Sequence, residues 1–167
     1  MTNAAKPDEK QPTSASVQRV IDAAENLGIE ISVIEYPEQT RTAEQAAEAV
    51  GCAVDQIVKS MIFDADGEIV LALTSGANQV DTSLLAELAG VDRCGRADAD
   101  RVRTVTGFAI GGVAPLGHTT AVRTWIDAHL LDFDEVWAAA GTPRHVFAID
   151  PSFLAKAIGA VTAGFTS

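Results

Sequence analysis

The stretch Ile57-Val-Lys-Ser-Met-Ile-Phe63, with Asp64-Ala-Asp-Gly67 and Glu68-Ile-Val-Leu-Ala-Leu73 directly after it, decides the fold. Each apolar run contains β-branched residues, which favour strands, and an Asp-Gly pair between two such runs is a strong hairpin signal. The sequence therefore predicts two strands, over 57–63 and 68–73, that pair through a tight turn at residues 64–67.

Helical and extended patterns alternate on both sides of this hairpin. Apolar periodicity, capping residues and terminal glycines predict helices at 17–27, 42–51, 82–90 and from Asp150-Pro151 onward. Short apolar runs predict strands at 29–36, 124–127, 135–138 and 146–149. Residues 91–122 show no clear pattern. The expected fold class is a single α+β domain of about six or seven strands and four or five helices.

Length and composition are those of one globular domain. The 167 residues are 47% hydrophobic and 21% charged, which are ordinary values for a chain with a buried core. Residues 1–13 hold two prolines, mixed charge and little to bury, so we expect a flexible tail followed by one domain over 14–167. Because the sequence has no apolar run of the signal-peptide or membrane-span type, we expect a cytoplasmic protein with no membrane partner.

Charge narrows the classes of partner. The formal net charge is −11, with only 12 lysines and arginines. Broad binding to nucleic-acid phosphates requires clustered basic residues, so the sequence argues against a DNA-binding surface and leaves room for a small, local RNA contact. Cys52 and Cys94 lack metal-site spacing and are expected to be reduced thiols, with a single disulfide as the alternative.

Lys59 is the first candidate functional residue. Strand alternation places it on the same face as Ile57, Met61 and Phe63. A cation in an apolar row costs free energy unless its ammonium group reaches water or an anion. Two interpretations follow: the lysine stem packs while its head stays in solvent, or the lysine lies in a pocket and anchors an anionic or carbonyl-bearing ligand.

The second candidate is a loop over residues 106–118, which contains four glycines and Pro115. Exposed N–H groups in such a loop can bind a carbonyl oxygen or a phosphate, although a purely structural turn fits the pattern equally well. The loop matches neither the P-loop nor the GxGxxG pattern. His118, His129 and His145 each stand alone in the sequence, and no Ser-His-Asp triad is indicated.

In this order, the lysine-bearing strand, the loop Gly111-Gly112-Val-Ala-Pro115-Leu-Gly117 and the segment Trp125-Ile-Asp127-Ala resemble the YbaK/ProX family of aminoacyl-tRNA deacylases. That family is related to the editing domain inserted in bacterial prolyl-tRNA synthetases, and the resemblance covers residues 15–163. It implies a compact mixed α/β domain around a barrel-like sheet. It also implies a hydrolase that acts in trans on mischarged aminoacyl-tRNA and so protects translation fidelity in protein biosynthesis.

The resemblance implies the reactants and partners as well. The cleared group would be a small amino acid such as Ala, Ser, Thr or Cys, carried on proline tRNA. The partners would be the acceptor end of the aminoacyl-tRNA and a prolyl-tRNA synthetase. No metal ion or organic cofactor is implied, because an aminoacyl ester is already activated and needs little more than positioning and stabilisation of its oxyanion.

Site residues follow from the same resemblance. Lys59 corresponds to the family's essential lysine, which would hold the terminal nucleotide or the ester end, and Ser60 takes the adjacent position. Gly111 and Gly112 would turn their backbone toward the ester carbonyl. The other positions implied in that loop are Pro115 and Gly117.

The late segment departs from the cysteine-clearing branch of the family. Tyr36 resembles the tyrosine that lines the pocket in that branch, but Ala139 falls where the branch has a serine, so its substrate does not transfer directly. Thr142 or His145 is the hypothesis for the pocket wall here. The alternative function is an inactive module of the same fold that binds a nucleotide, a tRNA end or a synthetase.

Overall fold

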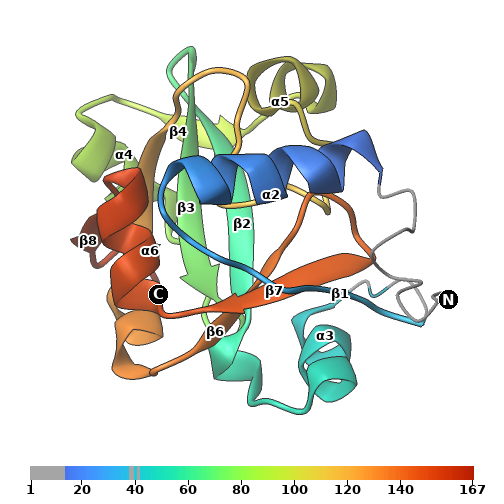
Figure 1. Ribbon diagram of the computed structural model, residues 1–167. Coiled ribbons are helices and arrows are strands. Elements are labelled where there is room, and N and C mark those ends of the chain that lie inside the picture. The colour runs from blue at the N-terminus through green and yellow to red at the C-terminus, as the bar shows by residue number, and fades with distance from the viewer. Residues whose placement is uncertain (1–13, 38–39, 41) are drawn as a thin grey trace, which may run out of the picture.

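The computed structural model describes residues 14–37, 40 and 42–167, which form a mixed α+β domain (Figure 1). Within those ranges it contains five α-helices and eight strands in two sheets. The tail expected over 1–13 lies outside the described residues. No helix in the described ranges has the length and apolar character needed to cross a membrane.

Helices and strands alternate along the chain, largely where the sequence predicts them. The helices are α2 (Ala15–Asn26), α3 (Ala43–Val50), α4 (Thr82–Ala89), α5 (Ala99–Thr106) and α6 (Pro151–Ile158), with 3-10 turns η1 (Val54–Gln56) and η2 (Ala128–Asp132). The strands are β1 (Val33–Glu35), β2 (Val58–Ala65), β3 (Glu68–Ser75), β4 (Cys94–Arg96), β5 (Arg123–Asp127), β6 (Val136–Ala139), β7 (His145–Ile149) and β8 (Val161–Ala163).

The predicted hairpin forms the centre of the larger sheet, whose strand order is β4-β2-β3-β5-β8. β2 and β3 are antiparallel, with Lys59 opposite Thr74. Asp66 and Gly67 both have positive φ, which a tight hairpin turn requires. β5 and β8 add in parallel, so the sheet is mixed, as the sequence resemblance implies.

The smaller sheet has the order β1-β7-β6 and is antiparallel throughout. It meets the larger sheet at a parallel bridge between Ile57 and Trp137, directly before β2 begins. The barrel-like arrangement therefore takes the form of two sheets that join at one corner. This corner is where the candidate site lies.

Short elements account for the differences from the predictions. The strand expected over 29–36 is limited to 33–35. Residues 91–122, which lack a clear pattern, contain β4 and α5, and β8 adds an eighth strand to the six or seven predicted. β1, β4 and β8 are three-residue strands at sheet edges. Their extent is set by the neighbour that they pair with more than by their own residues.

The main core lies between the larger sheet and the elements that cover one of its faces. Val20 and Ala24 of α2 pack with Leu71 and Leu73 of β3 and with Phe147 of β7. Figure 1 shows α2, β1 and β7 across the same face of β2 and β3. A second apolar cluster contains residues from the larger sheet, from α4 and from the C-terminal segment.

Arg19 connects α2 to both ends of the glycine-rich loop. Its guanidinium donates hydrogen bonds to the backbone oxygens of Gly107 (2.6 Å) and Gly117 (3.1 Å) and lies 4.4 Å from the centroid of the Phe108 ring. A Cβ atom at Gly107 would lie within 2.3 Å of the guanidinium, and its φ is +84°, so glycine is required there. The loop is thus fixed against one helix.

We expect Arg19→Met to destabilise the domain by about 2–4 kcal/mol, because two carbonyl groups lose a charged donor and the cation–π contact with Phe108 disappears. Urea unfolding followed by tryptophan fluorescence measures the change. Arg103→Met is the matched control: Arg103 is exposed on α5, and its replacement should shift stability by less than about 0.5 kcal/mol. Equal unfolding midpoints for the two variants would contradict the role assigned to Arg19.

Candidate functional site

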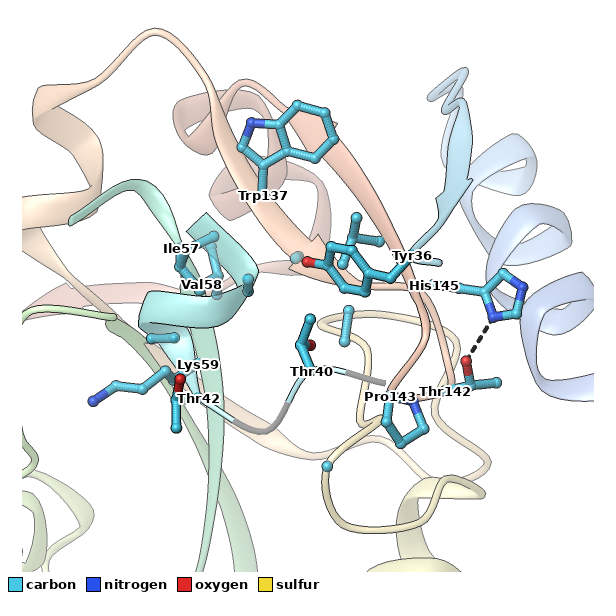
Figure 2. A pocket seen from close by; sticks show the side chains of 16 residues that line it. Tyr36, Thr40, Thr42, Ile57, Val58, Lys59, Trp137, Thr142, Pro143 and His145 are labelled. Atoms are coloured by element: carbon cyan, nitrogen blue, oxygen red, sulfur yellow. Dashed lines mark hydrogen bonds between the residues drawn. The ribbon is translucent and has the colours of Figure 1, made fainter. Parts of the chain in front are cut away.

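A cavity of about 140 Å³ lies at the corner where the two sheets meet. The end of β1, the starts of α3 and β2, the β6–β7 hairpin and the glycine-rich loop form its wall (Figure 2). The lining residues are Tyr36, Thr40, Thr42, Ala43, Ala46, Ile57, Val58, Lys59, Gly111, Trp137, Ala138, Ala139, Thr142, Pro143, His145 and Val146. The structure therefore brings together five residues predicted from sequence: Tyr36, Lys59, Gly111, Thr142 and His145.

Lys59 is the second residue of β2 and lies half-buried in the cavity wall. Its ammonium donates a 2.6 Å hydrogen bond to the backbone oxygen of Asn78, in the loop after β3. Burial lowers the pKa of Lys59 below its usual value, while Glu44 and Asp127 act in the opposite direction. Because the atom that holds the ammonium is a neutral carbonyl, the positive charge remains available to a ligand.

Tyr36 directly follows β1 and is only 3% exposed. Its backbone N–H donates to the oxygen of Arg144 (2.7 Å), which fixes the residue beside the β6–β7 hairpin. The hydroxyl group is buried and has no hydrogen-bond partner among the described residues. Figure 2 shows this oxygen directed toward the side of the pocket that Ile57 and Val58 form. Burial, with a smaller contribution from Cys52, raises the pKa of Tyr36 to about 12, so the phenol stays protonated at neutral pH.

The glycine-rich loop contributes Gly111 to the cavity and lies against the β6–β7 hairpin through Gly112. Gly111 has φ +97°. A Cβ atom at Gly112 would lie 2.6 Å from Cα of Thr142, so the two backbones approach as closely as glycine permits. The N–H of Gly112 donates to the oxygen of Ala109 (3.0 Å) and closes a turn. Of the two predicted oxyanion donors, Gly112 therefore has its N–H already occupied.

Thr142 and His145 form a hydrogen bond across the β6–β7 turn, between Oγ1 and Nδ1 at 2.6 Å (Figure 2). Thr142 Oγ1 also accepts the backbone N–H of Arg144 at 3.1 Å, so this side chain connects the turn backbone to the histidine ring. Figure 2 shows the imidazole on the far side of Tyr36 from Lys59.

The other predicted site residues are not part of the cavity wall. The hydroxyl of Ser60 is buried without a hydrogen-bond partner among the described residues, and Pro115 is buried. The backbone oxygen of Gly117 accepts from Arg19. These three residues neighbour the cavity-lining residues in sequence but do not line the cavity themselves.

Sequence reasoning missed most of the apolar wall and one buried acid. Trp137 and Val146 belong to alternating strands, and nothing in that pattern separates a pocket wall from core. Asp127, at the end of β5, is 4% exposed and hydrogen-bonded to the loop that holds Lys59. The available signal was its place in the segment Trp125-Ile-Asp127-Ala, directly after two apolar residues.

The fold and pocket define a class of protein. Residues 37–157 match the family model described as the aminoacyl-tRNA editing domain, and the chain belongs to this family. The match includes Lys59, the glycine-rich loop and the β6–β7 hairpin. The family to which the sequence resemblance pointed is thus confirmed.

Two kinds of relative share parts of this sequence. The protein YwhH of Bacillus subtilis (strain 168), described as uncharacterized, is 28% identical over 128 residues, covering 76% of this chain and 81% of that protein. The proline–tRNA ligase of Staphylococcus aureus (strain MRSA252) is 34% identical over 86 residues, covering 52% of this chain and 15% of the ligase. The match to the ligase thus concerns a small part of a much longer protein.

Solved structures extend the similarity to nearly the whole chain. The crystal structure of a protein described as a candidate trans-editing enzyme for prolyl-tRNA synthetase is 43% identical, with a TM-score of 0.88, and covers 93% of this chain and 99% of that one. A second crystal structure, of a hypothetical protein, is 27% identical with a TM-score of 0.81 over 89% of this chain and 99% of that one. These matches confirm the expected fold class.

Because Tyr36 is the single tyrosine of the chain, its ionisation can be followed by phenolate absorbance. We expect a midpoint at about pH 12 in the folded protein and near 10 in urea. Folding raises this pKa, so the stabilisation from the neutral phenol is complete below pH 10 and is lost as the pH rises toward 12. A midpoint near 10, with circular dichroism showing a folded chain, would contradict the burial of the hydroxyl.

Proposed function

We propose that this protein is a trans-editing aminoacyl-tRNA deacylase, which hydrolyses the ester joining a wrong, small amino acid to the terminal adenosine of proline tRNA. The observation that carries the proposal is the position of Lys59 and Gly111 on one small cavity of an editing-domain fold. In this proposal the enzyme acts in the cytoplasm on the acceptor end of the tRNA. A prolyl-tRNA synthetase supplies the mischarged substrate and is the candidate protein partner.

The size of the cavity supports a small amino acid. Its volume of about 140 Å³ is well below the roughly 300–1,000 Å³ of pockets for drug-sized ligands. Ile57, Trp137 and Val146 give it an apolar wall. The unpartnered hydroxyl of Tyr36 offers one hydrogen bond inside that wall. Side chains of the size of Ala, Ser, Thr and Cys suit such a space.

The reaction requires little acid–base chemistry from side chains. Water attacks the carbonyl carbon of the ester, the bond from that carbon to the ribose oxygen breaks, and the proton lost by the water ends on the ribose. The Lys59 ammonium and the N–H of Gly111 would stabilise the tetrahedral oxyanion. The neighbouring ribose hydroxyl of the substrate would activate the water. The N–H of Gly112 donates to the oxygen of Ala109 and is not assigned to the oxyanion. The role of Gly112 would be to allow the close backbone approach to Thr142.

The direct test is deacylation of proline tRNA charged with Ala, Ser, Thr or Cys. We expect the wild type to clear at least one of these species, and Lys59→Ala to lower that rate by about 100-fold or more, because a charge at the developing oxyanion is lost. Lys59→Arg retains the charge but not its position, and should rescue the rate only in part.

Two controls accompany this assay. Lys156 is exposed on α6, so Lys156→Ala should leave the rate unchanged. Correctly charged proline tRNA should survive the incubation. Failure of the folded wild type to clear any of the four species would favour the inactive binding module, and turnover of simple amino-acid esters without tRNA would favour a small-ester hydrolase.

His145 is expected to influence which amino acid is accepted. Removing the imidazole in His145→Ala frees the Thr142 hydroxyl and alters the β6–β7 wall, so the ratio of kcat/KM between two small amino acids should change by about 10-fold. Thr142→Val, which removes the hydroxyl and keeps the shape, should shift the ratio in the same direction. Unchanged rate and preference in His145→Ala would exclude His145 from the site.

A further inference from the structure

Asp127 is a buried carboxylate that no step of the proposed reaction uses. It is 4% exposed and lies at the end of β5. Its Oδ2 accepts the backbone N–H of Ser75 (3.0 Å) and the side-chain amide of Asn78 (2.9 Å), and its Oδ1 accepts the backbone N–H of His129 (3.0 Å). These donors compensate the cost of burying the charge. All three donors are neutral groups, so none of these hydrogen bonds neutralises the negative charge of Asp127.

Asn78 connects this carboxylate with Lys59. Its side-chain amide donates to Asp127, and its backbone oxygen accepts the lysine ammonium at 2.6 Å. Its backbone N–H donates to the oxygen of Ser75 at 3.0 Å, so the residue is fixed at three atoms. A single residue therefore joins the buried anion to the cation in the cavity wall.

The loop that carries Asn78 has little freedom to place its carbonyl elsewhere. The N–H of Gly76 donates to the oxygen of Ile57 at 2.7 Å. A Cβ atom at Gly76 would lie 2.5 Å from the oxygen of Val54, so this end of the loop is in close backbone contact with η1. The side-chain bond to Asp127 then determines how Asn78 is oriented at the middle of the loop.

We propose that Asp127 is a positioning residue for Lys59: through the side-chain amide of Asn78, it fixes the carbonyl oxygen that holds the ammonium of this cavity-lining lysine. This inference rests on the proposed role of Lys59 in deacylation. Asp127 is not part of the cavity wall, so it acts on the lysine and not on the substrate. The negative charge of Glu44 and, to a smaller extent, that of Asp127 oppose the lowering of the Lys59 pKa by burial.

Asparagine cannot reproduce these contacts at position 127. Three donors need acceptors on both carboxylate oxygens, and an amide offers one oxygen and one NH₂ group. In one orientation the NH₂ faces the N–H of His129, and in the other it faces the donors of Ser75 and Asn78. In either orientation a donor opposes a donor. Asp127→Asn therefore removes the charge and disturbs the geometry while it preserves the volume.

The first experiment follows Lys59 without any substrate. NMR of the protein with lysine labelled with ¹³C at Cε gives at most four signals, because the chain has four lysines: Lys6, Lys10, Lys59 and Lys156. The signal that disappears in Lys59→Arg is that of Lys59. Asp127→Asn should shift that signal and lower the pKa it reports. Asn78→Ala, which removes the amide and leaves the backbone, should cause a smaller change in the same direction.

Asp132→Asn is the matched control for this titration. Asp132 is an exposed carboxylate that pairs with the ring of His129, and among the described residues it makes no hydrogen bond to Asn78 or Lys59. Its replacement should leave the Lys59 signal in place. An unchanged Lys59 titration in folded Asp127→Asn and Asn78→Ala would overturn the inference, whatever the activity of the protein.

The second experiment is a double-mutant cycle on deacylation. Asp127→Asn should lower kcat by about 10–100-fold with little change in KM, because a catalytic group displaced by a fraction of an ångström loses its alignment. In the Lys59→Ala background the same substitution should cost nothing further. Additive losses would show that Asp127 acts independently of Lys59 and would overturn the link. If the wild type clears no tRNA, the proposed function fails, while the lysine titration still decides this inference.

Discussion

A lysine ammonium held partly out of water, at the corner where two sheets meet, is the constraint on which the site depends. Removing a cation from water costs free energy unless fixed dipoles replace the lost hydration. Here the replacement is the backbone oxygen of Asn78, 2.6 Å from the ammonium. The carbonyl dipole replaces the lost hydration but does not neutralise the positive charge, so Lys59 retains its charge for a ligand. In the arrangement proposed above, the buried Asp127 orients this carbonyl by accepting the side-chain amide of Asn78.

The shape of the cavity depends on close backbone approaches. Gly112 lies against Thr142, and Gly141 lies against Ser16 of α2, in each case at a distance that a Cβ atom would not allow. These contacts hold the β6–β7 hairpin between the glycine-rich loop and α2. The hairpin in turn presents Thr142 and His145 to one side of the cavity, opposite Lys59 on β2. A small, preformed space follows from rigid backbone rather than from large side chains.

This arrangement suits a reaction whose substrate is already activated. A pocket with one cation, backbone donors and an apolar wall offers charge stabilisation and selection by size, and leaves the proton transfers to the substrate. The net charge of −11 agrees with the proposed function, in which the protein contacts a tRNA over a small area only. None of the three histidines is hydrogen-bonded to a serine among the described residues, as a Ser-His-Asp triad would require. His118 contacts Ala114, His129 contacts Asp55 and Asp132, and His145 contacts Thr142.

The sequence alone determined the elements with strong local signals. Alternating apolar residues around Asp66-Gly67 specified the central hairpin, caps and terminal glycines specified the helices after residues 42, 81 and 150, and the motifs indicated Lys59 and the glycine-rich loop. Tertiary structure decided the rest. β1, β4 and β8 exist through pairing at sheet edges, and the orientation of the Lys59 ammonium depends on Asn78 and Asp127, which are 19 and 68 positions away. Local propensity acts over a few residues, whereas burial and hydrogen bonding of a charge are properties of the folded surroundings.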